Sequence, residues 1–163
     1  MIFTVPWAQS LVITSIVCLV LIVVPFTNLF LKFRYFPRLH LSILVTVLMA
    51  ILLLPALFVV RGYKLANHNL YIQRLGWSSK IELSNFVDAE IDPQAMEKSF
   101  VLWGNGGFLS ITGKHHNHKL GNFEAYATDP HLAVVLTFPE LKIVVTPEDP
   151  SHFVRELNRD RRV

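Results

Sequence analysis

Residues 121–153 have the sequence GNFEAYATDPHLAVVLTFPELKIVVTPEDPSHF, and this stretch decides the fold expected for the second half of the chain. Apolar runs at 122–128, 132–138 and 141–145 predict three β-strands. Only Pro139-Glu140 separates the last two runs, which leaves room for a hairpin and for nothing larger. Asp149 and Pro150 then have the spacing of an N-cap and a first helical residue, so a helix is expected to follow the strands.

Short apolar runs of the same kind begin directly after Gly62. Earlier strands are expected at 63–66, 70–75, 80–83, 87–91, 100–103 and 108–112. In the final helix Phe153 and Leu157 lie four residues apart, so they would form one apolar stripe that packs on the sheet. The sequence therefore predicts that residues 62–163 form an antiparallel, all-β barrel or sandwich closed by one C-terminal α-helix.

The first 61 residues have a different composition. No charged side chain occurs from Leu11 to Leu31 or from Leu41 to Val60. Each stretch is long enough, as a helix, to cross the ~30 Å hydrocarbon core of a bilayer. No Lys or Arg precedes the first stretch, which argues against a secretory signal peptide. Residues 1–61 are therefore expected to be a membrane anchor of two transmembrane helices, at about 9–31 and 39–60.

The charges are unevenly distributed along the chain. All 12 Asp and Glu residues and 12 of the 15 Lys and Arg residues lie from Arg61 onward, so this part of the chain is formally neutral and the net charge of +3 comes from Lys32, Arg34 and Arg38. A formally neutral domain has no surplus basic face for phosphates, and nucleic acid is not expected as a partner. Basic residues at the two ends of the predicted helices slightly favour a cytoplasmic domain. The expected membrane-interface residues are Lys32, Arg34, Arg38, Arg61 and Lys64.

The domain resembles the bacterial pleckstrin-homology (PH) family. The resemblance is carried by G-N-F-E-A-Y-A-T (121–128), I-V-V-T-P-E-D-P-S-H-F (143–153), I-x-L-S-N-F (81–86) and W-G-N-G-G-F (103–108). It covers roughly residues 62–158 and implies a PH-like fold attached to transmembrane helices, in the inner membrane of a bacterial cell. It supplies no catalytic residues, and the ligands of the family are poorly defined.

A histidine-rich segment, KHHNHK at 114–119, is expected to be a polar loop between Gly113 and Gly121. The three imidazoles of His115, His116 and His118 are candidate ligands for Zn²⁺, Ni²⁺ or Cu²⁺, and histidine also titrates near neutral pH. The flanking lysines oppose a cation, and a ligand-free hairpin tip explains the composition equally well.

The sequence contains none of the common catalytic motifs and offers no cysteine nucleophile, because Cys18 lies inside the first apolar stretch. Neither enzymatic activity nor a cofactor is expected. The leading interpretation is a membrane-anchored, non-catalytic PH-like domain that acts as a protein-interaction or scaffold module. Its expected partners are the bilayer and either a membrane protein or a second copy of the chain. One alternative is a module that binds lipid headgroups or the membrane surface, and another is a metal- or pH-responsive sensor.

Overall fold

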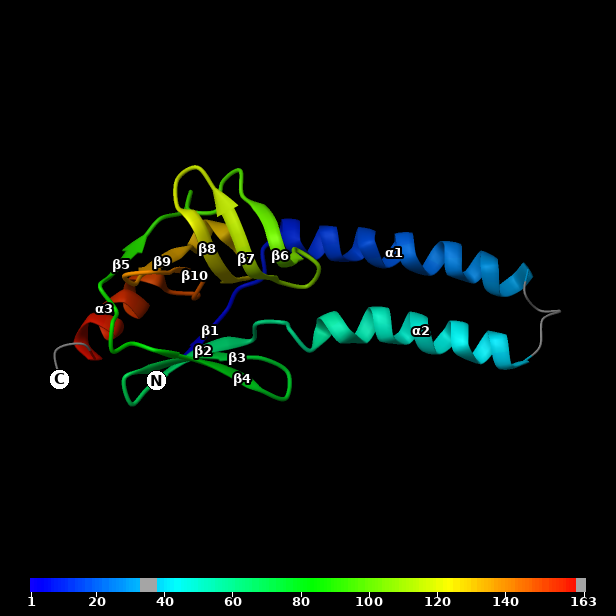
Figure 1. Ribbon diagram of the computed structural model, residues 1–163, viewed down its shortest axis with the longest axis horizontal. Coiled ribbons are helices and arrows are strands. Elements are labelled where there is room, and N and C mark those ends of the chain that lie inside the picture. The colour runs from blue at the N-terminus through cyan, green and yellow to red at the C-terminus, as the bar shows by residue number, and fades with distance from the viewer. Residues whose placement is uncertain (33–37, 161–163) are drawn as a thin grey trace.

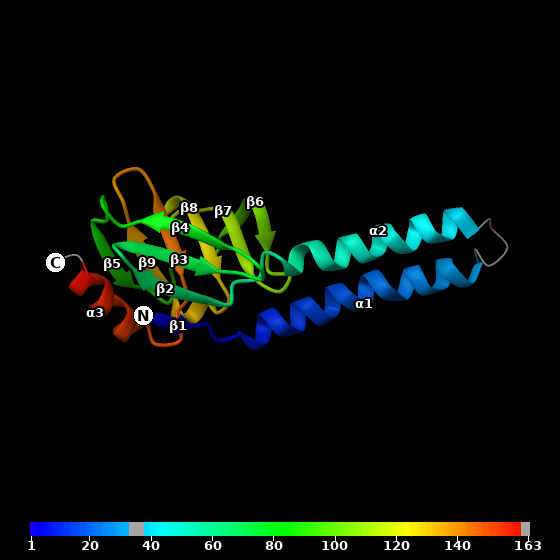
Figure 2. The same ribbon diagram turned by 90° about the horizontal axis from the view of Figure 1, so that it is seen from below.

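The computed structural model describes residues 1–32 and 38–160, which form a β-rich domain and two long helices (Figure 1). The helices α1 (Gln9–Lys32) and α2 (Arg38–Ala56) lie side by side, run in opposite directions and extend from one end of the domain (Figures 1 and 2). By length and composition α1 can cross a membrane, over Gln9–Asn28. The apolar stretch found in α2, Val45–Ala56, is shorter. The second transmembrane helix expected at 39–60 therefore stays a prediction.

Within the described residues the domain contains ten strands, and the helix α3 (Pro150–Asp160) lies at the end opposite α1 and α2 (Figure 1). The strands are β1 (Ile2–Thr4), β2 (Gly62–Ala66), β3 (Asn69–Gln73), β4 (Ser78–Glu82), β5 (Asp88–Ile91), β6 (Phe100–Gly106), β7 (Ile111–Asn117), β8 (Gly121–Ala127), β9 (Val134–Thr137) and β10 (Lys142–Val145).

These strands form two separate sheets, one with the order β1-β2-β3-β4 and one with the order β5-β9-β10-β8-β7-β6. The sheets do not close on each other, so the barrel alternative is wrong and the domain is a sandwich. Neighbouring strands are antiparallel except β8 and β10, which are parallel. This exception arises because the chain passes through a short 3-10 helix (Pro130–Leu132) to β9 and then returns as β10 between β9 and β8.

Strand β1 was not expected, because residues 1–61 were assigned to the membrane anchor. It pairs with β2 in the antiparallel register Phe3↔Tyr63, so residues 2–4 belong to the first sheet of the domain. Three residues are too few for an alternating pattern to be recognised in a sequence. Phe3 is only 6% exposed, whereas its neighbour Ile2 is 64% exposed.

The main core lies between the two sheets and beneath α3. The rings of Phe3 and Phe153 are 5.1 Å apart, and Phe153 and Leu157 are fully buried, which confirms the apolar stripe predicted for the last helix. Asp149 caps this helix as predicted, because its Oδ1 accepts a hydrogen bond of 2.9 Å from the backbone N–H of His152.

The β6–β7 connection differs from the prediction. Residues 108–110, expected to begin a strand, lie in a bend that covers 107–110. Strand β7 extends from Ile111 to Asn117, through most of the segment expected to be a polar loop. His115 and Asn117 are both 2% exposed and face a second, smaller core on the outer side of the six-stranded sheet. Packing on this outer face holds polar residues in a strand, which their composition alone does not predict.

Candidate functional site

Strand β6 is a free edge of the six-stranded sheet, because among the described strands it pairs with β7 alone. Its first four residues are apolar and exposed. Their exposed fractions are 56% for Phe100, 41% for Val101, 51% for Leu102 and 80% for Trp103. The register shifts between Val101 and Trp103, and this bulge breaks the usual alternation of inward and outward side chains. An apolar edge with unpaired backbone groups is a surface that another strand can join.

Two glycines bring β6 and β7 unusually close together directly after Trp103. Gly104 and Gly113 lie opposite each other, with φ angles of +126° and +109°. A Cβ atom on Gly104 would lie 2.2 Å from the carbonyl oxygen of Thr112, and one on Gly113 would lie 2.3 Å from that of Trp103. Only glycine therefore permits this approach, which fixes the geometry of the hairpin that follows.

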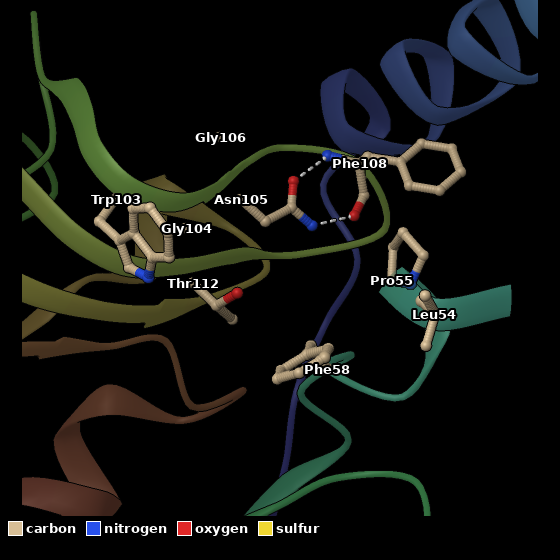
Figure 3. A pocket seen from close by; sticks show the side chains of 9 residues that line it. All are labelled: Leu54, Pro55, Phe58, Trp103, Gly104, Asn105, Gly106, Phe108 and Thr112. Atoms are coloured by element: carbon tan, nitrogen blue, oxygen red, sulfur yellow. Dashed lines mark hydrogen bonds between the residues drawn. The ribbon is translucent and has the colours of Figure 1, made fainter. Parts of the chain in front are cut away.

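A pocket of about 590 Å³ lies between the C-terminal end of α2 and the β6–β7 hairpin (Figure 3). Apolar side chains make up most of its wall, and Asn105 and Thr112 contribute polar atoms. The lining residues are Leu54, Pro55, Phe58, Trp103, Gly104, Asn105, Gly106, Phe108 and Thr112.

Asn105 organises the tip of the hairpin. Its Oδ1 accepts a hydrogen bond from the backbone N–H of Phe108 (2.9 Å), while its amide donates to the carbonyl oxygen of Phe108 (Figure 3). The same Oδ1 also accepts from the backbone N–H of Gly107 at 3.1 Å. One side chain thus satisfies three backbone groups that would otherwise need water.

The same tip is attached to α1 and to the segment that directly follows α2. The N–H of Leu109, a residue with a φ of +65°, donates to Ser15 Oγ in α1 at 2.8 Å. The hydroxyl of Ser110 donates to the carbonyl oxygen of Phe58, just beyond α2, at 3.5 Å. One face of the first turns of α1 is buried, with Leu11 4% and Ser15 7% exposed, whereas Val12 and Ile13 between them are exposed.

Arg74 forms the joint between α2 and the four-stranded sheet. Its guanidinium carbon lies 4.2 Å from the ring centroid of Trp77, 5.3 Å from that of Tyr126 and 5.8 Å from that of Phe58. Burial lowers the pKa of Arg74, but an arginine remains cationic and such cation–π contacts are stabilising. The indole N–H of Trp77 also donates to the carbonyl oxygen of Leu57 at 3.2 Å.

Tyr126 lies on the other side of this joint. Its hydroxyl donates to Glu124 Oε2 at 3.0 Å, and its pKa is raised to about 12, first by burial and then by the charge of Glu124. A phenol with such a high pKa stays protonated at neutral pH and serves as a hydrogen-bond donor.

A comparison with protein-family models matches residues 61–161 to the family described as "Bacterial PH domain". The chain belongs to this family. Comparisons with curated proteins and with solved structures found no match. Family membership suggests a non-catalytic binding or scaffold module.

The histidines expected to bind metal diverge in this bacterial PH domain. His115 faces the outer core and stacks on Phe123 at 5.7 Å, whereas His116 lies on the opposite face of β7 with its Nδ1 2.7 Å from Asn122 Oδ1. His118 is exposed in the following turn. No group of three His, Cys, Asp or Glu side chains suited to a metal ion occurs in the part of the chain that the structure describes. The metal site stays a prediction. Because successive side chains of β7 point to opposite faces of the sheet, His115 and His116 do not face a common metal position.

Burial lowers the pKa of His115, and a hydrogen bond with the backbone of Thr112 acts in the opposite direction. Among the described residues the Nε2 atom of this ring has no hydrogen-bond partner. The environment of His115 therefore favours the neutral imidazole.

The predicted membrane-interface residues fall into two groups. Arg61 and Lys64 are exposed at the start of β2, next to the ends of the helices nearest the PH domain. Lys32 is the last residue of α1 and Arg38 the first of α2, at the far end of the helical pair (Figure 1). Arg34 lies outside the described residues. Contact of these five residues with a membrane stays a prediction.

Sequence reasoning missed the pocket and the attachment of the hairpin to the helices. One signal was available, because the stretch from Phe100 to Gly113 contains no charged residue although it lies in the charged half of the chain. The roles of Ser15 and Asn105 were not visible, since both depend on contacts that only the folded chain creates.

Proposed function

We propose that the chain is a multi-pass, membrane-anchored and non-catalytic binding module of the bacterial inner membrane. In this proposal α1 and α2 hold the PH domain at the membrane surface, and strand β6 docks another protein there, either a neighbouring membrane protein or a second copy of the chain. The observation that carries the proposal is the succession of four exposed apolar side chains, Phe100 to Trp103, on a free sheet edge.

The exposed surface of the helices supports anchoring. Only 11% of the candidate span in α1 is buried, and apolar side chains such as Leu21 and Val24 are more than half exposed. Exposing this apolar surface to water is unfavourable in free energy, whereas contact with the hydrocarbon core of a bilayer is favourable.

The pairing of β1 with β2 supports two crossings instead of one. Residues 2–4 precede α1, residues 62–66 follow α2, and the two strands are hydrogen-bonded neighbours. Both ends of the helical pair must therefore lie on the same side of any membrane that the pair enters. If α1 crosses the bilayer, the chain has to cross again before β2, and α2, about 28 Å long at ~1.5 Å per residue, is the segment available for it.

Strand β6 is suited to protein docking because both recognition elements are present. The backbone groups of a free edge supply hydrogen bonds to an incoming strand, and the exposed apolar side chains supply buried area. Charged residues, which commonly protect sheet edges from such pairing, are absent from β6.

Photo-cross-linking in native membranes tests this function. A photoreactive amino acid would replace Leu102 on β6 in the full chain, and a matched control would replace the exposed Glu82 on β4, an edge strand of the other sheet. We expect one discrete cross-linked product at position 102 and none at position 82. The mass of the product distinguishes a second copy from a different protein.

A second variant tests whether the cross-linked product depends on strand pairing at the edge of β6. Replacing the exposed Val101 by lysine should abolish the product at position 102 without changing the thermal stability of the purified protein, because a charge on the edge opposes strand pairing. Equal cross-linking at positions 102 and 82, or none at either, would overturn the docking role of β6.

Anchoring and sidedness need separate measurements. The full chain should remain in the membrane pellet after alkaline extraction, as expected for a spanning protein. In sealed inside-out vesicles, protease should remove a C-terminal epitope tag if the domain faces the cytoplasm, as we propose from the distribution of basic residues.

A further inference from the structure

We propose that the tip of the β6–β7 hairpin, residues 104–110, enters the bilayer beside the helices, and that the pocket behind it holds a lipid acyl chain. This inference rests on the proposed membrane anchoring and adds a second contact with the bilayer, made by the PH domain itself.

The first argument is depth. The N–H of Leu109 is bonded to Ser15, which lies well inside the apolar span that begins at Gln9. At about 1.5 Å per residue, Ser15 is about 9 Å along the axis from Gln9. Residues 16–32 alone cover only about 25 Å, less than the ~30 Å of a hydrocarbon core. The apolar layer therefore has to begin nearer to Gln9 than Ser15 lies. The hairpin tip then lies at or just below the boundary between headgroups and acyl chains.

The second argument is the internal pairing of four backbone groups in the turn of the tip, residues 107–109. A backbone group that is bonded within the protein costs much less to place in an apolar layer than an unbonded one. Asn105 satisfies the N–H groups of Gly107 and Phe108 and the carbonyl of Phe108, and Ser15 satisfies the N–H of Leu109. The stretch from Phe100 to Gly113 also contains no charge that would have to leave water.

The third argument is the position of the tryptophans. The chain has three, and all are partly exposed where helices and domain meet, with exposed fractions of 46% for Trp7, 44% for Trp77 and 80% for Trp103. Trp7 immediately precedes α1, Trp77 donates to the carbonyl of Leu57 beyond α2, and Trp103 lines the pocket. Tryptophan is enriched at the interfacial level of membranes, and all three tryptophans occur at the junction where the proposed anchoring places the membrane surface.

The pocket fits the apolar part of a lipid. Leu54, Pro55 and Phe58 form the wall on the side of α2, and Phe108 lies on the hairpin side (Figure 3). The apolar wall is continuous with the exposed surface of α2, where Leu54 is 57% exposed, so an acyl chain lying along the helix can extend into the pocket. Among the described residues, no charged side chain lines the pocket, which favours an acyl chain over a headgroup as the occupant.

Depth-dependent fluorescence quenching tests the inference. All three tryptophans would be replaced by phenylalanine in the full chain, and a single tryptophan would then be introduced as Phe108→Trp, Leu21→Trp or Arg155→Trp. Each protein would be reconstituted into phosphatidylcholine vesicles whose acyl chains carry bromine at a shallow, middle or deep position. Arg155 is exposed in α3, at the end of the domain opposite the helices, and Leu21 lies near the middle of α1.

We expect tryptophan at position 108 to be quenched several-fold more strongly than at position 155, with the strongest effect from shallow bromines. Position 21 should be quenched most strongly by deep bromines. If position 21 is quenched and position 108 behaves like position 155, the hairpin inference is wrong while anchoring stands. If position 21 is not quenched, the proposed anchoring itself is wrong.

A second measurement covers the case in which the tryptophan-free chain does not fold. In a Cys18→Ser background that keeps the native tryptophans, a nitroxide label would be attached through Phe108→Cys, Leu21→Cys or Arg155→Cys. Labels at positions 108 and 21 should be more accessible to oxygen than to a water-soluble nickel complex, and the label at position 155 should show the reverse. A label at position 108 that behaves like the one at position 155 would overturn the inference.

Discussion

At the scale of single residues, the paired glycines of β6 and β7 are, among the described glycines, those with the least space for a side chain. Gly104 and Gly113 each leave no space for a Cβ atom, because a backbone carbonyl of the opposite strand occupies that place. A backbone carbonyl cannot rotate away as a flexible side chain would. The hairpin geometry, and with it the pocket, therefore depends on both positions remaining glycine.

Replacing Gly113 by alanine should lower the free energy of unfolding by roughly 1–3 kcal/mol, since the substitution combines a clash with an unfavourable φ. Chemical unfolding of the detergent-solubilised protein would measure this. Gly121→Ala is the matched control, because its φ is also positive, at +71°, but no atom lies within 4 Å of the added Cβ. A loss at Gly113 no larger than that at Gly121 would show that the close strand approach is unimportant.

His115 should make stability dependent on pH. Burial lowers its pKa in the folded protein, whereas the unfolded chain has the ordinary histidine pKa of about 6.5. Between these two values the unfolded state binds more protons, so the free energy of unfolding falls as the pH drops below about 6.5 and is retained above it.

The variant His115→Phe removes this proton-linked term, and its stability should fall less than that of the parent between pH 7 and 5. Unfolding curves recorded across this range provide the comparison, with His118→Phe, at an exposed position of the next turn, as the control. If parent and His115→Phe lose stability in parallel, the titration of His115 does not contribute.

At the scale of elements, the Ser15 side chain joins α1 to the β6–β7 hairpin. Ser15 accepts from Leu109 while its own hydroxyl donates to the carbonyl of Leu11 at 2.8 Å. Thr27 makes the same kind of bond to its own helix, at 2.8 Å from the carbonyl of Val23, but it is exposed. The two positions therefore separate the effect of hairpin attachment from that of a helical hydroxyl.

Ser15→Ala should destabilise the protein by about 1–3 kcal/mol, because the N–H of Leu109 loses its partner in a partly buried place. Thr27→Ala should have an effect within about 0.5 kcal/mol. Thermal unfolding in detergent would compare the two variants, and hydrogen exchange at Leu109 should become faster only in Ser15→Ala. Unchanged exchange there would contradict the attachment of the tip through Ser15.

The elements also show where sequence reasoning succeeds and where it stops. The β9–β10 hairpin and the capped helix α3 were predicted because their signals are local, such as Pro139-Glu140 and the Asp149-Pro150 pair. The separation of the two sheets, the parallel β8–β10 pair and the strand β1 depend on contacts between distant segments, so no local pattern revealed them. The histidine segment was misplaced for the same reason, since the burial of His115 depends on Phe123.

At the scale of the whole molecule, β1 links the segment before the helices to the core of the domain behind them. Phe3 packs against Phe153 of α3, and its ring also lies 5.3 Å from that of His152. A residue more than 140 positions away thus completes the packing of the last helix. The stability of the PH domain should depend on this short strand.

Phe3→Ala should reduce the free energy of unfolding by about 3–5 kcal/mol, as expected for a buried phenylalanine. Ile2→Ala on the same strand should have little effect, because that side chain is exposed. Thermal unfolding of the full chain measures both. Similar values for the two variants would show that β1 is not part of the folded core.

The order in which the chain is synthesised gives the β1–β2 pair a further consequence. β1 leaves the ribosome roughly 60 residues before β2, a delay of about 3–12 s at common rates of translation. If the two helices span a bilayer as proposed above, both must be inserted during that interval. A chain with one helix misinserted would have β1 and β2 on opposite sides of the bilayer, where Tyr63 and Phe153 would lack the ring of Phe3. In such a chain the incomplete first sheet would expose unpaired strands and apolar surface. Cellular proteases recognise these features, so a misinserted chain would be degraded.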